Sequence, residues 1–337
     1  MRRSELVSAL DDGRWQCNVC QWRCALAEGE RGRCLVRVGA TDGIIVENDG
    51  LISAAVVGPI EDYRLWHLLP GAQMLALGGW GYAFPVDQQR GPYGTIPVDP
   101  AKQRRLPPEK AAAFALDQLC RGVIWNFSDP AVAHEYALEI LQISRSSSRI
   151  TALVTSGYET IAAIDRLGHY LDAISLDLRA FDDAAYLRLA GVEQWRGILD
   201  AVAYAKNRWG CHVEVQTRLH PGVNDTADQI HGMVAWIRDT LGPQTAWHIL
   251  PGDAGAAAAQ SAARAKRVGH EQGLKFIYGA DMQQPTNCPA CGNLIIDRTG
   301  QARVVGLTEH GCSRCGERIE IRTSIFKDEV AKRSERA

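Results

Sequence analysis

The sequence predicts an α/β protein whose centre is a partial or complete (β/α) barrel of the TIM type, with a cysteine-rich module at each end. Short runs dense in Val, Ile and Leu alternate with amphipathic helical stretches between residues 71 and 282. These runs are apolar on both faces, which is typical of strands in a parallel sheet covered by helices. No G-x-G-x-x-G follows the first strand, so the sequence does not indicate a dinucleotide-binding sheet.

The expected elements are six strand–helix units and a closing strand. The first strand covers 73–77 and is followed, after a proline-rich segment, by a helix over 107–120. Five further strands, each followed by helical sequence, and then the closing strand are expected over 122–127, 150–156, 171–178, 212–219, 245–250 and 274–279. Barrels of this kind carry their chemistry at the C-terminal ends of the strands. We therefore expect a site at the loop after the first strand, "GGWGYAFPVDQQ".

Composition limits the classes of function. The 37 Lys and Arg residues nearly balance the 39 Asp and Glu residues, and the formal net charge of -2 gives no reason to expect nucleic acid or an anionic membrane as a partner. No apolar run approaches the ~18 residues of a membrane helix, and the first residues turn polar at once. We expect a soluble, cytoplasmic protein. The expected segments are an N-terminal four-cysteine module, the barrel, a zinc-ribbon module and a polar tail, at 1–70, 71–282, 283–325 and 326–337.

The C-terminal cysteines form two Cys-x2-Cys pairs, "CPACGN" and "CSRCGE". Each pair predicts a tight turn that points two thiolates at one ion, with the following glycine in a positive-φ conformation. The intervening segment "LIIDRTGQARVVGL" predicts a β-hairpin that turns at Thr299 and Gly300. The pattern predicts a closed, structural zinc site with a role in folding or docking, and its ligands are Cys288, Cys291, Cys312 and Cys315.

The N-terminal group comprises Cys17, Cys20, Cys24 and Cys34, which are separated by two, three and nine residues. Three close cysteines and a fourth farther along can hold zinc or an iron–sulfur cluster. The tight "EGERGRC" turn and the short reach of the segment favour structural zinc, and a cysteine-rich module without metal is the third alternative. The isolated Cys120 and Cys211 are expected to be small buried apolar residues.

Six segments in order make the chain resemble one family. They are "CNVCQWRCALAEGERGRCLVR", "GPIEDYRLWHLLPG", "WNFSDPAVAHEYA", "LDAISLDLRAF", "EVQTRLHPGVND" and "CPACG". The chain is similar, from about residue 15 to residue 320, to the radical SAM protein of the AmmeMemoRadiSam system, a relative of pyruvate formate-lyase activating enzymes. The resemblance implies a radical SAM barrel. It also implies a loop after the first strand whose Cys-x3-Cys-x2-Cys motif holds a [4Fe–4S] cluster that binds and reductively cleaves S-adenosylmethionine.

The chain departs from that motif. Laid on this sequence, the three cysteine positions hold Trp80, Phe84 and Asp87. Two aromatic rings supply no ligand, and one carboxylate cannot hold a [4Fe–4S] unit, so radical chemistry is not expected at this loop. The family's Thr-Asn-Gly and Asn-Glu-Pro are "TSG" and "SDP" here, which also argues against binding of S-adenosylmethionine.

Polar residues at expected strand ends could still line a pocket at the mouth of the barrel. They are Asn126, Ser156, Asp177, Arg179, His220 and His248. A salt bridge between Asp177 and Arg179, and half-buried hydrogen-bonded histidines, are the structural alternatives.

Three functions are compatible with these patterns. The first is a non-catalytic, metal-binding scaffold or partner subunit that docks another enzyme, conceivably an active radical SAM paralogue. The second is an enzyme with repurposed chemistry, either through S-adenosylmethionine, through a metal at Asp87, His220 and His248, or through a cluster on the N-terminal cysteines. The third is a binder of small molecules in the former cofactor pocket.

Overall fold

The computed structural model describes residues 2–252 and 255–324 of the chain, and its centre is an eight-stranded sheet. The strand order is β16-β15-β14-β13-β12-β11-β9-β8, in which β8 pairs antiparallel with β9 and every other neighbour is parallel. In chain order the strands are β8 (Ala54–Pro59), β9 (Gln73–Gly78), β11 (Gly122–Trp125), β12 (Ile150–Thr155), β13 (Ala173–Asp177), β14 (His212–Leu219), β15 (Trp247–Pro251) and β16 (Ile277–Tyr278). All seven expected strands are present.

The sheet has two edges. Within the described residues no strand pairing joins β16 to β8, so hydrogen bonds do not close it into a complete barrel. The seven parallel strands form a mostly parallel α/β sheet, and its barrel-like curvature remains a prediction. Because the strands are parallel, their C-terminal ends lie along one edge of the layer, and we call this edge the mouth.

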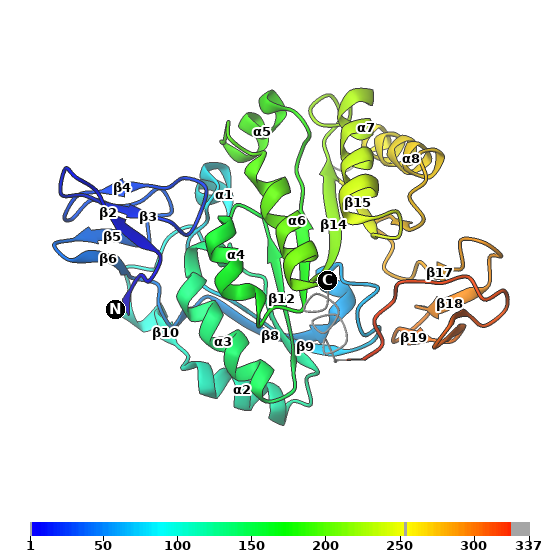
Figure 1. Ribbon diagram of the computed structural model, residues 1–337, viewed down its shortest axis with the longest axis horizontal. Helices are drawn as coiled ribbons and strands as arrows, with labels where there is room; N and C mark the ends of the chain where they lie inside the picture. Colours follow the sequence, from blue (N-terminus) through cyan, green and yellow to red (C-terminus); the bar gives the residue numbers. More distant parts are fainter. Residues whose placement is uncertain (1, 253–254, 325–337) are drawn as a thin grey trace.

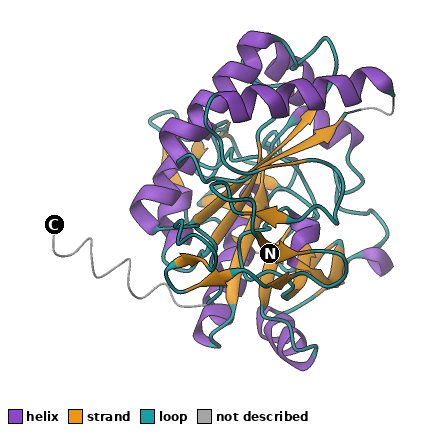
Figure 2. Cartoon of the chain, turned by 90° about the vertical axis from the view of Figure 1, so that its right-hand side faces the viewer, coloured by secondary structure: helices purple, strands orange, loops and turns teal. Residues whose placement is uncertain are grey.

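Helices connect the parallel strands and cover the outer face of the sheet (Figures 1 and 2). Three of them begin at a side-chain cap of the expected type, with Thr160, Asp182 or Thr226 accepting a backbone N–H of the first turn. The helices are α1 (Pro85–Arg90), α2 (Pro108–Asp117), α3 (His134–Ser146), α4 (Ile161–Gly168), α5 (Asp183–Ala190), α6 (Gly197–Trp209), α7 (Ala227–Trp236) and α8 (Ala256–Glu271).

Alternate side chains of each strand enter different cores. In β9, Leu75 and Leu77 join the large cluster that the helices complete, whereas Met74 and Ala76 face a second cluster. This second cluster is filled by the segment 60–72, whose Ile60, Leu65 and Leu68 are buried. The inner face of the sheet is therefore closed by the chain that precedes the first parallel strand.

The N-terminal module consists of two small antiparallel sheets, with strand orders β1-β6-β5 and β2-β3-β4. The short strand β7 (Leu51–Ile52) pairs with β10 (Arg104–Arg105), which comes from the loop after α1. This pairing ties the module to the central α/β domain. The strands are β1 (Arg2–Arg3), β2 (Val7–Ala9), β3 (Trp15–Cys17), β4 (Ala25–Leu26), β5 (Arg37–Ala40), β6 (Gly43–Val46) and the pair β7 (Leu51–Ile52) and β10 (Arg104–Arg105).

The C-terminal module is a β17-β18-β19 sheet with a separate β20-β21 pair, and it lies at the other end of the molecule (Figure 1). The strands are β17 (Thr286–Asn287), β18 (Leu294–Asp297), β19 (Arg303–Val304), β20 (Leu307–Thr308) and β21 (Gly311–Cys312). The expected hairpin around Thr299 and Gly300 is confirmed, because β18 and β19 pair antiparallel on either side of it.

One expected boundary differs from the structure. The segment 1–70 was expected to be an N-terminal module, but β8 belongs to the central sheet and 60–72 fills its inner face. The run "AAVVGP" pairs with β9, so the sheet begins before residue 70. The expected tail 326–337 lies outside the described residues. Among the helices that the structure describes, none combines the length and apolar character needed to cross a bilayer.

Candidate functional site

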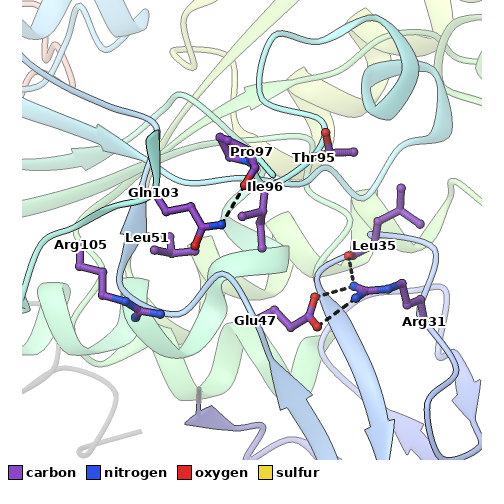
Figure 3. A pocket seen from close by; sticks show the side chains of 9 residues that line it. All are labelled: Arg31, Leu35, Glu47, Leu51, Thr95, Ile96, Pro97, Gln103 and Arg105. Carbon is purple, nitrogen blue, oxygen red and sulfur yellow. Dashed lines mark hydrogen bonds and ion pairs between the residues drawn. The ribbon is translucent and has the colours of Figure 1, made fainter. Parts of the chain in front are cut away.

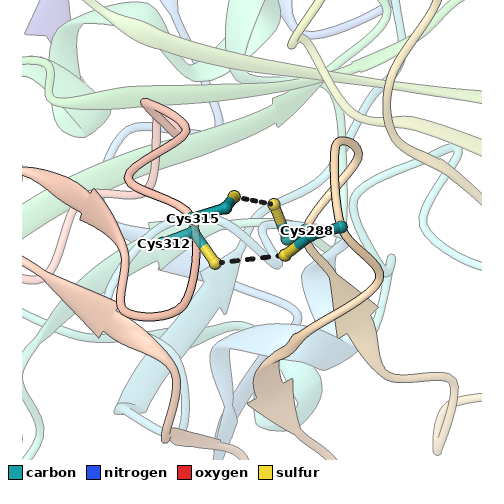
Figure 4. A group of neighbouring side chains, drawn as sticks. Cys288, Cys312 and Cys315 are labelled. Atoms are coloured by element: carbon teal, nitrogen blue, oxygen red, sulfur yellow. Dashed lines mark hydrogen bonds between the residues drawn. The ribbon is translucent and has the colours of Figure 1, made fainter.

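The C-terminal cysteines converge on one point. The Sγ atoms of Cys288 and Cys315 are 3.6 Å apart, those of Cys291 and Cys312 are 3.7 Å apart, and all four lie within 4.8 Å of one another. Figure 4 shows the sulfur atoms of Cys288, Cys312 and Cys315 facing one another. A Zn–S bond of about 2.3 Å in a tetrahedron separates its sulfurs by about 3.8 Å. The spacing therefore fits a single tetrahedral ion held by four thiolates.

Local chemistry builds this site. Gly292 and Gly316 follow the second cysteine of each pair with φ values of 72° and 76°, the left-handed conformation that the sequence predicts. The backbone N–H of Gly292 donates to Cys288 O, and that of Gly316 donates to Cys312 O, at 2.9 Å in both turns. The two turns are thus matched, and each points its pair of sulfurs inward.

The N-terminal cysteines are arranged differently. Cys17 ends β3, Cys20 and Cys24 lie in the turn that leads to β4, and Cys34 precedes β5. All four line one narrow, largely enclosed cavity. Within the described part of the chain, however, the C-terminal cysteines are the group whose ligand atoms all lie within 4.8 Å of one another, and the N-terminal four are not so gathered.

The loop after β9 is filled by its own side chains. Phe84 is fully buried, and its ring makes edge contacts with Tyr158 and Tyr186 at centroid distances of 5.2 and 6.5 Å. Trp80 meets Tyr93 edge to face at 5.9 Å, and its carbonyl accepts a hydrogen bond from Asn48. Phe84 therefore packs in the main core, whereas Trp80 is half-buried and packs against Tyr93.

Asp87, the third of these loop residues, forms an ion pair. Asp87, in α1, receives two hydrogen bonds from Arg179, Nη1 to Oδ1 at 2.9 Å and Nη2 to Oδ2 at 2.7 Å. Arg179 also bonds Asp177, Nη2 to Oδ2 at 3.1 Å, and its guanidinium lies 5.0 Å from the centre of the Phe84 ring. The expected Asp177–Arg179 salt bridge is thus present. A bidentate arginine–carboxylate pair has a fixed geometry, so this contact fixes α1 against the segment after β13.

These residues do not fit the cluster of the radical SAM family. None of Trp80, Phe84 and Asp87 offers sulfur or imidazole, the donors that iron–sulfur clusters require. The Phe84 ring and the Asp87–Arg179 pair already occupy the loop with satisfied contacts. The chain therefore supplies no ligand set for a cluster at this loop.

Other expected pocket residues lie at the mouth with different partners. Ser156 donates to Asp129 Oδ2 at 2.6 Å, whereas Asn126 follows β11 and donates its backbone N–H to Leu77 O. His220 follows β14, and its backbone N–H donates to Asn224 Oδ1 at 2.6 Å. The structure thus joins Asp87, Asp177 and Arg179 in one group of ion pairs. Ser156 belongs to a separate hydrogen bond with Asp129.

Two carboxyl groups at the mouth, those of Asp129 and Glu159, are buried, which the sequence did not indicate. Asp129 bonds Ser156, and Glu159 accepts hydrogen bonds of 2.9 and 3.0 Å from Thr155 Oγ1. Burial, and next the Asp129 carboxylate, raise the pKa of Glu159 to about 8. The signal for Asp129 and Glu159 in the sequence is their place just after β11 and β12, but nothing there shows their burial.

His248 does not lie at the mouth. It is the second residue of β15, so it sits near the N-terminal end of its strand and not after it. It is fully buried, and its Nε2 lies 2.8 Å from Glu214 Oε2. The expectation put His248 at a strand end after "TAW", although it falls inside the expected strand 245–250 and inside β15.

Glu214 is the centre of a buried network at that opposite edge. Its carboxylate is bonded by His212 Nε2 at 2.9 Å, by His248 Nε2 and by the backbone N–H of His67 at 2.7 Å. Burial alone would raise the pKa of Glu214, but the hydrogen bonds from His212 and His248 outweigh it and hold this pKa well below its ordinary value. The Glu214 carboxylate has its partners within the protein, whereas Nδ1 of His248 is buried without one. Because His248 lies at the opposite edge of the sheet from Asp87 and His220, these three residues do not form a ligand set for a metal.

A further cavity, of about 490 Å³, opens between the N-terminal module and the segment after α1 (Figure 3). None of the expected site residues lines it. Its lining includes the Arg31–Glu47 pair on one side and Gln103, which donates to Pro97 O at 2.8 Å, on the other. These polar groups already have partners within the protein.

No protein-family model matches the chain. An uncharacterized protein of Methanocaldococcus jannaschii is 26% identical over 337 residues, which cover 95% of this chain and 99% of that protein. Two proteins of Oleidesulfovibrio alaskensis, a choline trimethylamine-lyase activating enzyme and an isethionate sulfite-lyase activating enzyme, are each 25% identical, over 117 and 131 residues. These matches cover 35% and 39% of this chain and 37% and 41% of the two enzymes.

Solved structures were compared as well. A domain of a pyruvate-formate lyase-activating enzyme from Bacteroides vulgatus aligns with a TM-score of 0.42 and 14% identity, over 48% of this chain and 99% of that one. A radical SAM methyltransferase from Sphaerobacter thermophilus aligns with a TM-score of 0.48 and 16% identity, over 67% and 71% of the two chains. The sequence matches make the chain a homologue of activating enzymes in the radical SAM superfamily.

Proposed function

We propose that this chain is a radical SAM-related protein of the AmmeMemoRadiSam type that builds no catalytic cluster after its first strand. In this proposal it acts in the cytoplasm as a metal-binding scaffold or partner subunit for another enzyme. The observation that carries the proposal is the state of the replaced loop. Phe84 is fully buried there, and Asp87 is held by two hydrogen bonds from Arg179.

The close packing of this loop supports loss of the cluster site over the alternative of an intact site that has not yet bound its cofactor. A buried arginine–carboxylate pair and a buried phenyl ring are costly to open, because separating the charges or exposing the ring costs several kcal/mol. Arg179 is 19% exposed and Asp87 23% exposed, so the pair is partly screened by solvent. A cofactor entering the loop would have to displace both contacts.

We further propose zinc at the C-terminal cysteines, since their sulfur spacing matches one tetrahedral ion. Such a closed site leaves no position for substrate, which suits a role in folding or docking. A metal at Asp87, His220 and His248 is not supported, because His248 is bonded to Glu214 at the other edge of the sheet. In the alternative that the protein is an enzyme, the buried carboxyl groups of Glu159 and Asp129 at the mouth are the candidate acid and base.

The test is cleavage of S-adenosylmethionine. Protein purified anaerobically is reconstituted with iron and sulfide, reduced with dithionite, and assayed for 5′-deoxyadenosine and methionine. We expect no turnover above a buffer control that contains the same iron, sulfide and reductant. Repeated turnover that persists after gel filtration of the reconstituted protein would overturn the proposal. An active radical SAM enzyme, run in parallel, confirms that the assay is competent.

A further inference from the structure

We infer that Cys17, Cys20, Cys24 and Cys34 bind an iron–sulfur cluster directly beside the replaced loop. The inference goes beyond the proposed function, since a scaffold needs no redox group and a scaffold role does not depend on one. The first support is convergence. The four side chains come from β3, from the turn after it and from the segment before β5, and they all line the same cavity.

The second support is the spacing of the sulfurs. The chain contains its own reference for a single ion, the C-terminal site, whose sulfur pairs are 3.6 and 3.7 Å apart. The N-terminal cysteines are described equally fully, surround a common cavity, and are not gathered within 4.8 Å of one another. In a cluster each thiolate binds a different iron or shares an iron with one other, so the sulfurs stand farther apart than around one zinc. The wider arrangement favours the cluster over the zinc that the short sequence spacing suggests.

The third support is the room around the sulfurs. A Cβ atom built on Gly32 would lie 3.8 Å from the Sγ atoms of both Cys24 and Cys34, so glycine leaves this wall of the cavity without a side chain. The remaining walls include the buried apolar residues Val19, Leu26 and Val132. An apolar surround of this kind limits access of solvent, which is one of the properties that set the potential of a cluster.

The fourth support is a buried donor without an acceptor. The side chain of Arg37 is 3% exposed and lines the same cavity. Its Nη atoms are bonded to Glu135 and Ser4, but its Nε–H has no partner within the protein. Buried N–H groups are rarely left unpaired, and the sulfur atoms of a cluster accept hydrogen bonds of this kind. Arg37 therefore has one donor available for the inferred group.

The position of the module places this group next to the mouth. The backbone N–H of Gln21 donates to Tyr158 O, that of Thr160 donates to Val19 O, and Trp22 Nε1 donates to Ala83 O at 2.7 Å. Tyr158 contacts both the Trp22 ring and the Phe84 ring. Four protein thiolates leave no iron open to a further ligand, so the inferred cluster is a candidate for electron transfer and not for binding of S-adenosylmethionine.

The experiment measures iron, acid-labile sulfide and zinc in the full chain purified anaerobically and reconstituted. We compare the wild type with three variants: Cys24→Ser/Cys34→Ser in the N-terminal group, Cys312→Ser in the C-terminal group, and Cys120→Ser as a control that removes a thiol elsewhere. We expect iron and sulfide in equal amounts in the wild type and the Cys120→Ser variant. The N-terminal double variant should lose both and keep zinc, whereas Cys312→Ser should lose zinc and keep iron.

Two results would overturn the inference. One is a reconstituted wild type that holds two zinc ions and no iron. The other is iron that survives in a folded N-terminal double variant, because the cluster would then sit elsewhere. If the double variant does not fold, the wild type decides the question by mass spectrometry. Alkylation of Cys20 and Cys24, which are partly exposed, should rise at least several-fold after oxidative removal of the iron, and unchanged alkylation would refute the site.

The outcome separates this inference from the proposed function. Absence of iron refutes the cluster and leaves the non-catalytic scaffold in place. A cluster that accepts one electron from dithionite, seen by electron paramagnetic resonance, without cleavage of S-adenosylmethionine, agrees with both. Cleavage that disappears in the Cys24→Ser/Cys34→Ser variant would refute the non-catalytic proposal and would also refute a closed cluster with four protein ligands.

Discussion

A buried ion pair links the N-terminal module to the barrel. Arg37 in β5 contacts Glu135 in α3, Nη2 to Oε2 at 2.6 Å and Nη1 to Oε1 at 2.9 Å, and the two side chains are 3% and 2% exposed. Burial alone would raise the pKa of Glu135, but the charge and hydrogen bonds of Arg37 outweigh it and lower this pKa to about 2. Both groups are therefore charged at neutral pH, and each buried charge is stabilised by the opposite charge of its partner.

Removing one charge of this pair should be costly. We expect Glu135→Gln to reduce the free energy of unfolding by about 3–5 kcal/mol, because Arg37 would remain buried without its counter-charge. The matched control is Glu139→Gln in the same helix, whose partner Arg2 and whose own side chain are partly exposed, and there we expect a change of about 1 kcal/mol or less. Urea denaturation followed by circular dichroism measures both. Equal effects of the two substitutions would show that the pair does not stabilise the fold.

The neighbouring His134 makes stability depend on pH. Burial lowers the pKa of His134 to about 4, so the folded protein keeps it neutral where the unfolded chain, with a pKa near 6.5, binds a proton. Stability should therefore fall as the pH falls from about 6.5 towards 4, by up to about 1.4 kcal/mol per pH unit from this group.

The histidine contribution is isolated by a difference between variants. We expect the free energy of unfolding of the wild type to fall more steeply than that of His134→Gln between pH 6.5 and 5, which also cancels the effect of acid on metal binding. His310→Gln, which changes an exposed histidine, should follow the wild type. Parallel curves for the wild type and His134→Gln would contradict the buried, neutral state of His134.

Among the elements, the loop after β9 with α1 shows how a site is filled. Phe84 belongs to the main core together with Leu77 of the strand that precedes it and Tyr186 of α5. Its side chain therefore joins the first parallel strand to a helix that lies about a hundred residues later. In the motif that the sequence resembles, this position would hold a metal ligand, whereas here it holds a residue of the core.

Truncating this ring should destabilise the protein. We expect Phe84→Ala to cost about 3–5 kcal/mol, from lost burial and from the cavity left behind. Phe114→Ala in α2 is the matched control, since Phe114 is 46% exposed, and its cost should stay near or below about 1 kcal/mol. Chemical denaturation compares the two. A cost for Phe84→Ala as small as the control would mean that the ring does not fill the loop.

At the scale of the elements, there are physical reasons why some features can be predicted from the sequence and others cannot. The strands were predictable because apolar residues such as Val123, Ile124 and Leu153 occupy both faces of the sheet. The turns at Gly292 and Gly316 were predictable because glycine readily adopts the positive φ that each Cys-x2-Cys turn requires. The partners of Glu214 were not predictable, because they come from residues 67, 212 and 248. His248 falls inside both the expected strand 245–250 and β15, near the N-terminal end of β15, so its assignment to the mouth was wrong.

On the scale of the whole molecule, the two cysteine modules contact different edges of the sheet. The N-terminal module contacts the mouth through Val19, Gln21 and Trp22. The C-terminal module contacts the opposite edge, where Arg298 donates to Trp66 O at 3.0 Å and lies 4.3 Å from the Trp66 ring. Cys288 and Cys312 share a core with Trp66 and Tyr278. A metal at the C-terminal site would therefore bear on the stability of the central α/β domain.

Loss of that metal should be felt by the entire fold. We expect Cys312→Ser, or removal of the metal by a chelator, to lower the melting temperature by about 3 °C or more, since a loss of roughly 2 kcal/mol has this effect in a chain of this size. Ser313→Ala, next to the ligand, is the control and should change little. Differential scanning calorimetry checks the shift. A separate low-temperature transition with an unaltered main transition would show that the module unfolds independently of the sheet.

The contact of Arg298 with Trp66 joins residues 232 positions apart in the chain. During translation Trp66 leaves the ribosome long before Arg298 is made, so the nascent chain must expose Trp66 and its neighbours until the segment around residue 298 has emerged. A chain released before that point would keep this apolar surface open and would be a natural target for chaperones and proteases. The segment around Arg298 thus completes the core that contains Trp66 and Tyr278.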